Sequence, residues 1–414
     1  MRPPTSIWVL LLAVTSISAA SGQDASTLES GNAVHNRRAF LQSWPETDTL
    51  TNDWFGEGDR LRESGITSTL NLWTVYQANV SGGLSKQGGL NGVYWFANHF
   101  DLEALIGLEG ASAYALVEGG WNDGINASAG SLMNVNGTGV GDQAIGVPRF
   151  WLEQKLFGDR LRVRGGKLDV SLDNFDFYGH SVGFDAMPFA NAPRTQFLDG
   201  GLVNNSAIPF PAAGLAGMLL VEPVDRWYLA AAALDRNTDA FETNFSNAFD
   251  EWMITLETGV VVPLGKENLQ GLYYAGYWHS TFDGSPDGNG VYLGVAQQLT
   301  RESMVTDGQG LGVFARYGYA DSIENDVSNF WSLGLQYEGL LPNRDKDVVA
   351  LGWAQAFTSG AEFSAPSEGV LECYYRASIS PWFHLSPHLQ YIANPGSNAI
   401  ADAVTVGVRG QITF

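Results

Sequence analysis

The sequence has little charge, one cysteine and no long apolar run in its body. Charged residues make up 16% of the 414 positions, against roughly 25% in soluble domains. Cys373 is the only cysteine, which excludes a disulfide framework and a cysteine-ligated metal site. After the first 20 residues, no run reaches the ~18 apolar residues of a membrane-spanning helix. Basic residues number 22 against 44 acidic ones, so no nucleic-acid partner is expected, because nucleic acid needs a basic face.

The first 20 residues have the pattern of a cleaved secretory signal. Arg2 supplies a positive charge, Ile7–Val14 an apolar segment, and Ser18–Ala20 the small residues of a cleavage site. We expect residues 1–20 to be a signal peptide of an exported protein, with a buried N-terminal strand as the alternative. Residues 21–65 are expected to form a periplasmic arm with a short helix in its last part.

The rest of the chain alternates apolar residues with small or polar ones. From Ile66 to Phe414 this pattern fills segments of about 10–13 residues, which clusters of Gly, Asp, Asn and Pro separate. At the end of the chain, Val404, Val406 and Val408 share one face, and Thr405 and Arg409 share the other. The alternation predicts β-strands with one apolar face.

Three features favour membrane-spanning strands over those of a soluble sandwich, which also alternate. The segments are as long as the ~9–11 residues of a transmembrane strand. Charged residues such as Glu257 and Glu338 occupy mid-segment positions, which a water-filled interior tolerates. Aromatic residues lie near segment ends, as at a membrane interface: Tyr76, Trp121, Trp227, Trp252, Tyr319 and Trp382.

Segment number and spacing predict the architecture. The approximate segment cores are 66–79, 89–103, 110–121, 148–157, 160–170, 211–222, 225–235, 250–263, 269–280, 289–300, 309–320, 328–340, 347–358, 368–380, 384–393 and 402–414. Short connections such as Gly158-Asp159 and Pro223-Val224 alternate with long ones at 122–147, 171–210 and 236–249. Because lipid offers no hydrogen-bond partners, a spanning sheet must close on itself. We predict an all-β fold, a transmembrane antiparallel barrel of about sixteen strands over residues 66–414, with a water-filled channel and both termini in the periplasm.

Several stretches resemble one known family, the carbohydrate-selective porins of the OprB type. The similar stretches are Gly65–Thr67, Phe150–Gln154, Leu161–Asp169, Gly310–Gly318, Glu372–Arg376 and Pro387–Ile392. The resemblance extends from about residue 54 to the terminal Phe414, the residue typical of bacterial outer-membrane barrels. It implies passive, carbohydrate-selective diffusion of mono- and oligosaccharides across the bacterial outer membrane. Loop 171–210 follows the family only loosely, so the preferred sugar stays open.

A selective sugar pore needs hydrogen-bonding groups and an aromatic surface, with binding weak enough for release. The alternation places such groups on the channel side; the candidate substrate-binding residues are Trp73, Trp151, Glu153, Lys155, Arg162, Arg164, Arg316, Glu372, Arg376 and Arg409, with Glu338 and His388 on the same side. Across the turn Gly158-Asp159, opposite charges are expected to face each other, and the arginine fork suits vicinal hydroxyls. We expect Trp151, Glu153, Arg162 and Arg164 to border the constriction together with loop 171–210.

Other interpretations stay open at this point. The channel charges can instead pair with each other and only stiffen the wall, and Trp151 can face lipid if the phase shifts by one. His384 and His388 lie about 13 Å apart on a strand and cannot share one metal ion. We expect no metal, no cofactor and no catalysis; Cys373 falls on the lipid-facing stripe. The expected partners are outer-membrane lipid and small neutral carbohydrates, and the sequence leaves a homo-oligomer undetermined. The alternatives are a general, weakly selective porin or an outer-membrane hydrolase.

Overall fold

The computed structural model describes most of the chain beyond residue 46. The described residues are 47–169, 183–184, 187–188, 194–211, 213–238, 241, 250–265, 268–282, 285–302, 309–321, 325–360 and 362–414. The expected signal peptide, residues 21–46 of the arm, and 171–182 with most of 185–193 of the long loop therefore lie outside the described residues.

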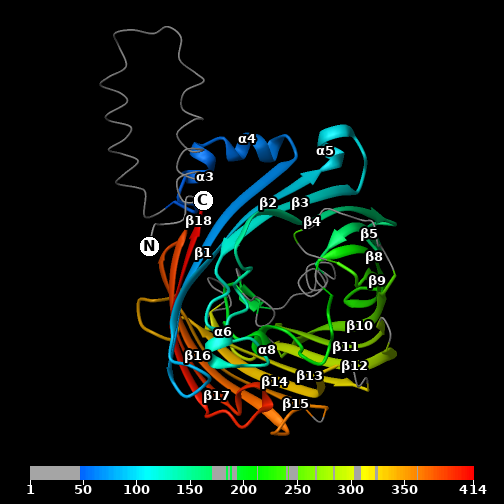
Figure 1. Cartoon of the computed structure of the whole chain (residues 1–414). Coiled ribbons are helices and arrows are strands. Elements are labelled where there is room, and N and C mark those ends of the chain that lie inside the picture. The colour runs from blue at the N-terminus through cyan, green and yellow to red at the C-terminus, as the bar shows by residue number, and fades with distance from the viewer. Residues whose placement is uncertain are drawn as a thin grey trace, which may run out of the picture.

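Sixteen antiparallel strands close into one barrel, in which the first strand pairs with the last (Figure 1). The barrel strands are β1 (Ile66–Ser81), β2 (Gly88–Asp101), β3 (Ala111–Trp121), β4 (Gln143–Leu156), β5 (Leu161–Leu168), β8 (Gly214–Val224), β9 (Trp227–Asp235), β10 (Trp252–Leu264), β11 (Leu269–Phe282), β12 (Ser285–Gln298), β13 (Gly310–Ala320), β14 (Val327–Glu338), β15 (Val348–Thr358), β16 (Ser367–Ser380), β17 (Phe383–Ala393) and β18 (Ala403–Thr413). The predicted fold class and strand number are confirmed. No helix in the described part of the chain is long and apolar enough to cross a membrane.

Three of the short helices lie at the end of the barrel where its first strand begins. Figure 1 shows α3 (Asn52–Phe55) beside the chain end at β18, whereas α4 (Gly58–Glu63) contacts β1 and α5 (Leu102–Ile106) contacts β2 and β3. The N-terminal segment is tied to the barrel, because the Leu50 N–H donates to the Thr413 carbonyl at 2.8 Å. The remaining short elements are α6 (Asn126–Ala129), α8 (Gly200–Val203), the 3-10 turn η3 (Pro395–Ser397), and the two-stranded sheet of β6 (Gly183–Phe184) and β7 (Met187–Pro188).

Two details of the predicted connections are wrong. The turn between β8 and β9 is Asp225-Arg226 rather than Pro223-Val224, because Arg226 takes the left-handed conformation (φ 70°) that a two-residue hairpin needs. Connection lengths also do not alternate strictly. The β12–β13 connection spans 299–309 on the short-turn side, whereas β11 and β12 are joined on the other side by residues 283–284 alone.

The two faces of the wall follow the predicted phase. Leu333 and Leu335 on β14 are exposed on the outside, and the residues that flank this pair, Ser332 and Gln336, are buried inside. The outer face is therefore apolar, as contact with lipid requires. Cys373 lies on the same outward stripe of β16 as Leu371 and Ile379, partly exposed.

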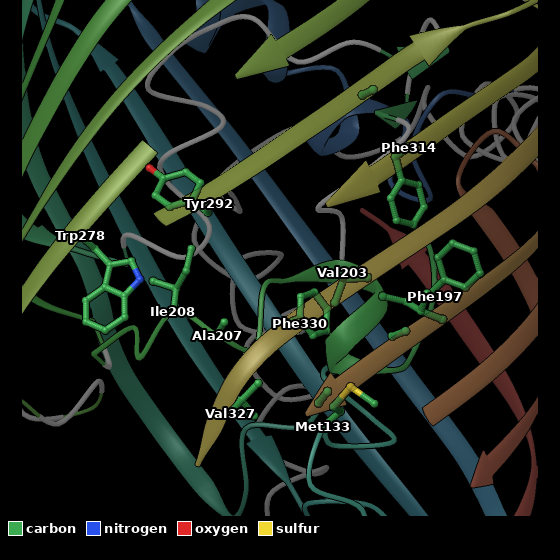
Figure 2. Close-up of a cluster of buried hydrophobic side chains, with 14 of the residues drawn as sticks. Met133, Phe197, Val203, Ala207, Ile208, Trp278, Tyr292, Phe314, Val327 and Phe330 are labelled. Carbon is green, nitrogen blue, oxygen red and sulfur yellow. The ribbon is translucent and has the colours of Figure 1, made fainter. Parts of the chain in front are cut away.

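The inner face is less polar than the prediction of a wet interior implies. Between β8 and β16 the wall turns apolar side chains inward, including Trp278, Phe314 and Phe330. These pack against residues of the β3–β4 and β5–β8 loops, among them Met133, Phe197, Val203 and Ile208 (Figure 2). Two loops thus fold into the barrel and cover one side of its interior, because apolar inward positions need a partner other than water.

Candidate functional site

Strands β4 and β5, which the turn Gly158-Asp159 joins, carry a compact group of inward-facing charged and aromatic side chains. Glu153 and Arg164 are direct partners across the two strands, and the Arg164 Nη2–Glu153 Oε2 distance is 2.9 Å. The Arg164 guanidinium lies 3.9 Å from the ring centroid of Trp151. Trp151 also stacks on Tyr114 of the neighbouring strand β3. Their ring centroids are 5.2 Å apart, with an interplanar angle of 18°. Trp151 is buried inside the barrel, while Phe150 and Leu152 on either side are exposed outside.

A second inward group continues this surface over β1 to β4. Arg194, from the β5–β8 loop, pairs with Glu118 of β3 (Nη2–Oε1 2.5 Å) and lies 4.4 Å from the ring centroid of Trp95. Arg149 of β4 also approaches Trp95, at 5.1 Å. Trp95 in turn contacts Trp73 of β1. We call these residues together the arginine–aromatic cluster: Trp73, Trp95, Tyr114, Trp151, Arg149, Arg164, Arg194, Glu118 and Glu153.

Six of the ten predicted site residues lie away from this cluster, and three of the six, Lys155, Arg162 and Arg376, lie near turns. Lys155 stands opposite Arg162 rather than opposite a carboxylate, so the prediction of facing opposite charges is right for Glu153–Arg164 and wrong for this pair. The Lys155 ammonium is 3.9 Å from Asp159 at the turn, and the Lys155 side chain is partly exposed while that of Asp159 is exposed. Arg376 lies on β16 beside Glu338 and Asp347, near the β14–β15 turn.

Glu372, Arg316 and Arg409 contact the inward β5–β8 loop through its backbone. The Glu372 carboxylate accepts hydrogen bonds from the N–H groups of Leu198 (2.8 Å) and Asp199 (2.9 Å). Arg316 donates to the Leu202 carbonyl at 2.9 Å, and Arg409 donates to the Gln196 carbonyl at 2.5 Å. The strands β13, β16 and β18 therefore hold residues 196–202 against the wall by both signs of charge.

Glu368, which is not among the predicted site residues, holds the β3–β4 loop against the wall in the same way. Its carboxylate accepts from the N–H groups of Leu132 (2.8 Å) and Met133 (3.0 Å) and from the Ser131 hydroxyl (2.7 Å). The two loops also join each other, because Gly200 N–H donates to the Asn134 carbonyl and Gly137 N–H to the Leu198 carbonyl, both at 2.8 Å. They form one inner layer, which we call the inner loop layer (residues 131–138 and 196–204).

A buried acid lies within the inner loop layer. Asp199 is fully buried; its Oδ1 caps α8 by accepting from Gly201 N–H at 2.9 Å. Its Oδ2 has no hydrogen-bond partner among the described residues. Burial raises the pKa of Asp199 well above its usual value, and the nearby carboxylates of Glu372 and Glu368 raise it further. A neutral Asp199 is therefore favoured while the layer is in place.

For two of the cluster residues that were not predicted, the alternation of the sequence indicates an inward position. Arg149 stands two residues before Trp151, so it shares its face of β4, and Glu118 occupies the inward phase of β3. Arg194 had no such signal, because it comes from a loop without periodicity. Among the described residues no group of three His, Cys, Asp or Glu side chains could hold a metal ion.

One sequence motif bears on catalysis. Gly179–Gly183 has the G-x-S-x-G spacing of a nucleophile elbow, in which the serine stands on a strand-to-helix turn of an α/β-hydrolase sheet. The described sheet of this chain is an antiparallel barrel without such a turn. Residues 179–182 themselves lie outside the described part of the chain.

Comparison with known proteins agrees with this architecture. The sequence matches the carbohydrate-selective porins of the OprB family over residues 86–285 and 282–414. It is 24% identical to Porin B of Pseudomonas aeruginosa over 449 residues, which cover 93% of this chain and 94% of that protein. The structure is similar to the high-pH structure of Pseudomonas putida OprB (TM-score 0.74) and to its low-pH structure (TM-score 0.59), each at 20% identity and over 89% of this chain and 99% of that chain. This chain therefore belongs to the OprB family of carbohydrate-selective porins, which are located in the bacterial outer membrane.

Proposed function

We propose that this porin conducts neutral mono- and oligosaccharides passively, and that the arginine–aromatic cluster is where they bind in transit. Trp151, Glu153 and Arg164 are the predicted residues to which we give this role, joined by Trp73. The single observation that carries the proposal is the Arg164–Trp151–Tyr114 stack beside the Arg164–Glu153 ion pair.

The chemistry of the cluster suits an uncharged, hydroxyl-rich solute. Aromatic rings offer faces to the C–H surfaces of a sugar, and the planar guanidinium offers paired donors to neighbouring hydroxyls. Two arginines of the cluster form ion pairs with carboxylates, Arg164 with Glu153 and Arg194 with Glu118. Because the charges are paired, the surface can exchange hydrogen bonds with hydroxyls without selecting strongly for either sign of ion.

The inner loop layer supports selectivity by shape. Its side chains Phe197, Leu202 and Met133 fill the apolar side of the barrel interior. A solute is thereby directed toward the polar side, where the cluster lies. In this proposal Glu372, Arg316 and Arg409 act as positioning residues for the layer rather than as sugar ligands.

The remaining expectations complete the proposal. The exposed apolar stripe on the outer face, with Leu333, Leu351 and Leu389 as examples, is suited to outer-membrane lipid as its partner. Transport by diffusion requires no catalytic step and no cofactor, and the proteins to which this chain is related are porins. Residues 1–20 are proposed to be a cleaved signal and residues 21–65 a periplasmic arm.

Current block of single channels tests the proposal. Glucose added at increasing concentration should interrupt the ion current of the purified protein in a planar bilayer, and the block should saturate as binding does. Arg164→Ala should weaken the block about tenfold, because one charge-assisted hydrogen bond and one stacking contact are lost. A current that glucose leaves unchanged would indicate a general, weakly selective porin instead.

A further inference from the structure

A buried carboxylate on another part of the wall takes no part in the arrangement described so far. Glu257 faces inward from β10 and is 9% exposed. It accepts hydrogen bonds from the hydroxyls of Tyr228 on β9 (2.6 Å) and Tyr292 on β12 (2.9 Å). Among the described residues no Lys, Arg or His lies near enough to pair with it, in contrast to Glu118 and Glu153.

The rings around Glu257 lie against the wall because glycines on neighbouring strands make room for them. A Cβ built on Gly276 would come within 2.0 Å of the Tyr292 ring, and one on Gly259 within 2.4 Å of the Tyr228 ring. Tyr274, the third ring, covers Gly294 in the same way and contacts Tyr292 edge to face, with centroids 6.2 Å apart. Rings seated on glycines present a flat aromatic surface to the interior.

The group retains both accessibility and unused hydrogen-bonding capacity. Glu257 keeps 9% of its surface exposed and Tyr274 is partly exposed, so part of the group stays open. Each carboxylate oxygen has about two acceptor positions, and the two tyrosines each occupy one. A carboxylate that is oriented by two phenols, has no cation beside it and adjoins an aromatic surface is suited to accept hydrogen bonds from neutral hydroxyls.

Its place on the wall relates it to the arginine–aromatic cluster. Arg164 of β5 pairs with Met218 of β8, Met218 with Ala232 of β9, and Ala232 with Thr255 of β10, two residues before Glu257. Three strand spacings and two residues separate Arg164 from Glu257, which is about 16 Å along the wall. A solute that leaves the cluster would meet Glu257 next, and conduction benefits from several weak positions rather than one strong one.

We propose that Glu257 and Tyr274, with Tyr228 and Tyr292 orienting the carboxylate, form a second binding position for neutral sugars. This rests on the proposed function, since it gives the same pore a second site. An oligosaccharide long enough to occupy both positions gains affinity from each, whereas glucose fills only one at a time.

The test compares two neutral probes, glucose and maltotriose, by block of single-channel current. In the wild type, maltotriose should block about tenfold more tightly than glucose, the effect of one additional charge-assisted hydrogen bond. Glu257→Gln keeps an oxygen for the tyrosines but removes the charge, and should bring maltotriose close to the glucose value while leaving glucose block by the cluster in place. Tyr274→Ala should do the same, whereas Tyr274→Phe keeps the ring and loses only the hydroxyl contact with Arg316, so it should keep most of the preference for maltotriose.

Glu338→Gln is the matched control, because Glu338 is also an inward, mostly buried carboxylate but has Lys346 beside it at 3.8 Å. It should leave the ratio between the two probes unchanged. A maltotriose-to-glucose ratio that is the same in wild type, Glu257→Gln and Tyr274→Ala would overturn the second position while glucose block continued to support the first. A wild type that neither probe blocks would overturn the proposed function, and the second position with it.

Discussion

The carboxylate of Glu372 accepts a hydrogen bond of 2.8 Å from the backbone N–H of Leu198, a residue 174 positions earlier in the chain. The same carboxylate accepts from Asp199 N–H, and His388 Nδ1 and the Gln390 amide approach it at 2.7 and 2.9 Å. One side chain thus joins the barrel wall to the inner loop layer. The position of the inner loop layer therefore depends on a wall residue that is distant from it in the sequence.

Removal of this contact should loosen the inner loop layer. Glu372→Ala leaves the N–H groups of Leu198 and Asp199 without their acceptor and removes one of the two acceptors of the Gln390 amide. The loss of a buried charged partner costs about 3 kcal/mol or more. We expect a larger and noisier single-channel conductance, with sugar block weakened although no cluster residue is changed. Glu372→Gln keeps one acceptor oxygen and should show a smaller effect of the same sign. Conductance identical to that of the wild type in both variants would show that other contacts hold the layer.

Arginine at position 164 should not be replaceable by lysine. Arg164→Lys keeps the charge beside Glu153 but loses the planar fork and the stacking over Trp151. Glucose block should weaken several-fold, close to the effect of Arg164→Ala. Arg162→Ala should weaken it less, because Arg162 lies nearer the turn and outside the cluster. Equal block in Arg164→Lys and wild type would mean that charge alone matters at this position.

We expect the stability of the inner loop layer to depend on pH through Asp199. Its raised pKa means that the layer favours the protonated acid, so this contribution to stability is complete below about pH 4 and is lost as pH rises through the raised pKa. Asp199→Asn keeps the Oδ1 cap of α8 and removes the titration. Channel noise should therefore rise with pH more steeply in the wild type than in Asp199→Asn between pH 4 and 8. Parallel pH profiles would exclude Asp199 as the titrating group.

The outer face can be tested with two leucines of equal exposure. Leu333, in the middle of β14, and Leu340, after its end, are both 50% exposed. Leu333→Arg should lower the free energy of unfolding in lipid vesicles by about 2–4 kcal/mol, and Leu340→Arg by about 1 kcal/mol or less, because the cost of arginine falls toward the interface. Similar values for the two variants in denaturant titrations would contradict the assignment of the outer face.

The local pattern of the sequence was sufficient for the wall but not for its contents. Strand number, inward phase and the Glu153–Arg164 pair follow from a repeat of two residues and a tight turn, which involve neighbours in the chain. The inner loop layer depends on contacts such as Glu372–Leu198 and Arg409–Gln196, which join distant segments without a periodic signal. The inward positions of Phe314 and Phe330 contradict the prediction of a polar interior. The residues that they pack against come from those loops, so the strand pattern gives no sign of them.

The central claim is that the pore prefers neutral sugars over charged solutes of the same size. Liposome swelling measures this directly when glucose and its acid, gluconate, are compared as osmotic solutes with the purified wild-type protein. We predict clearly faster swelling in glucose than in gluconate. Equal swelling rates for glucose and gluconate in the wild type would contradict the account.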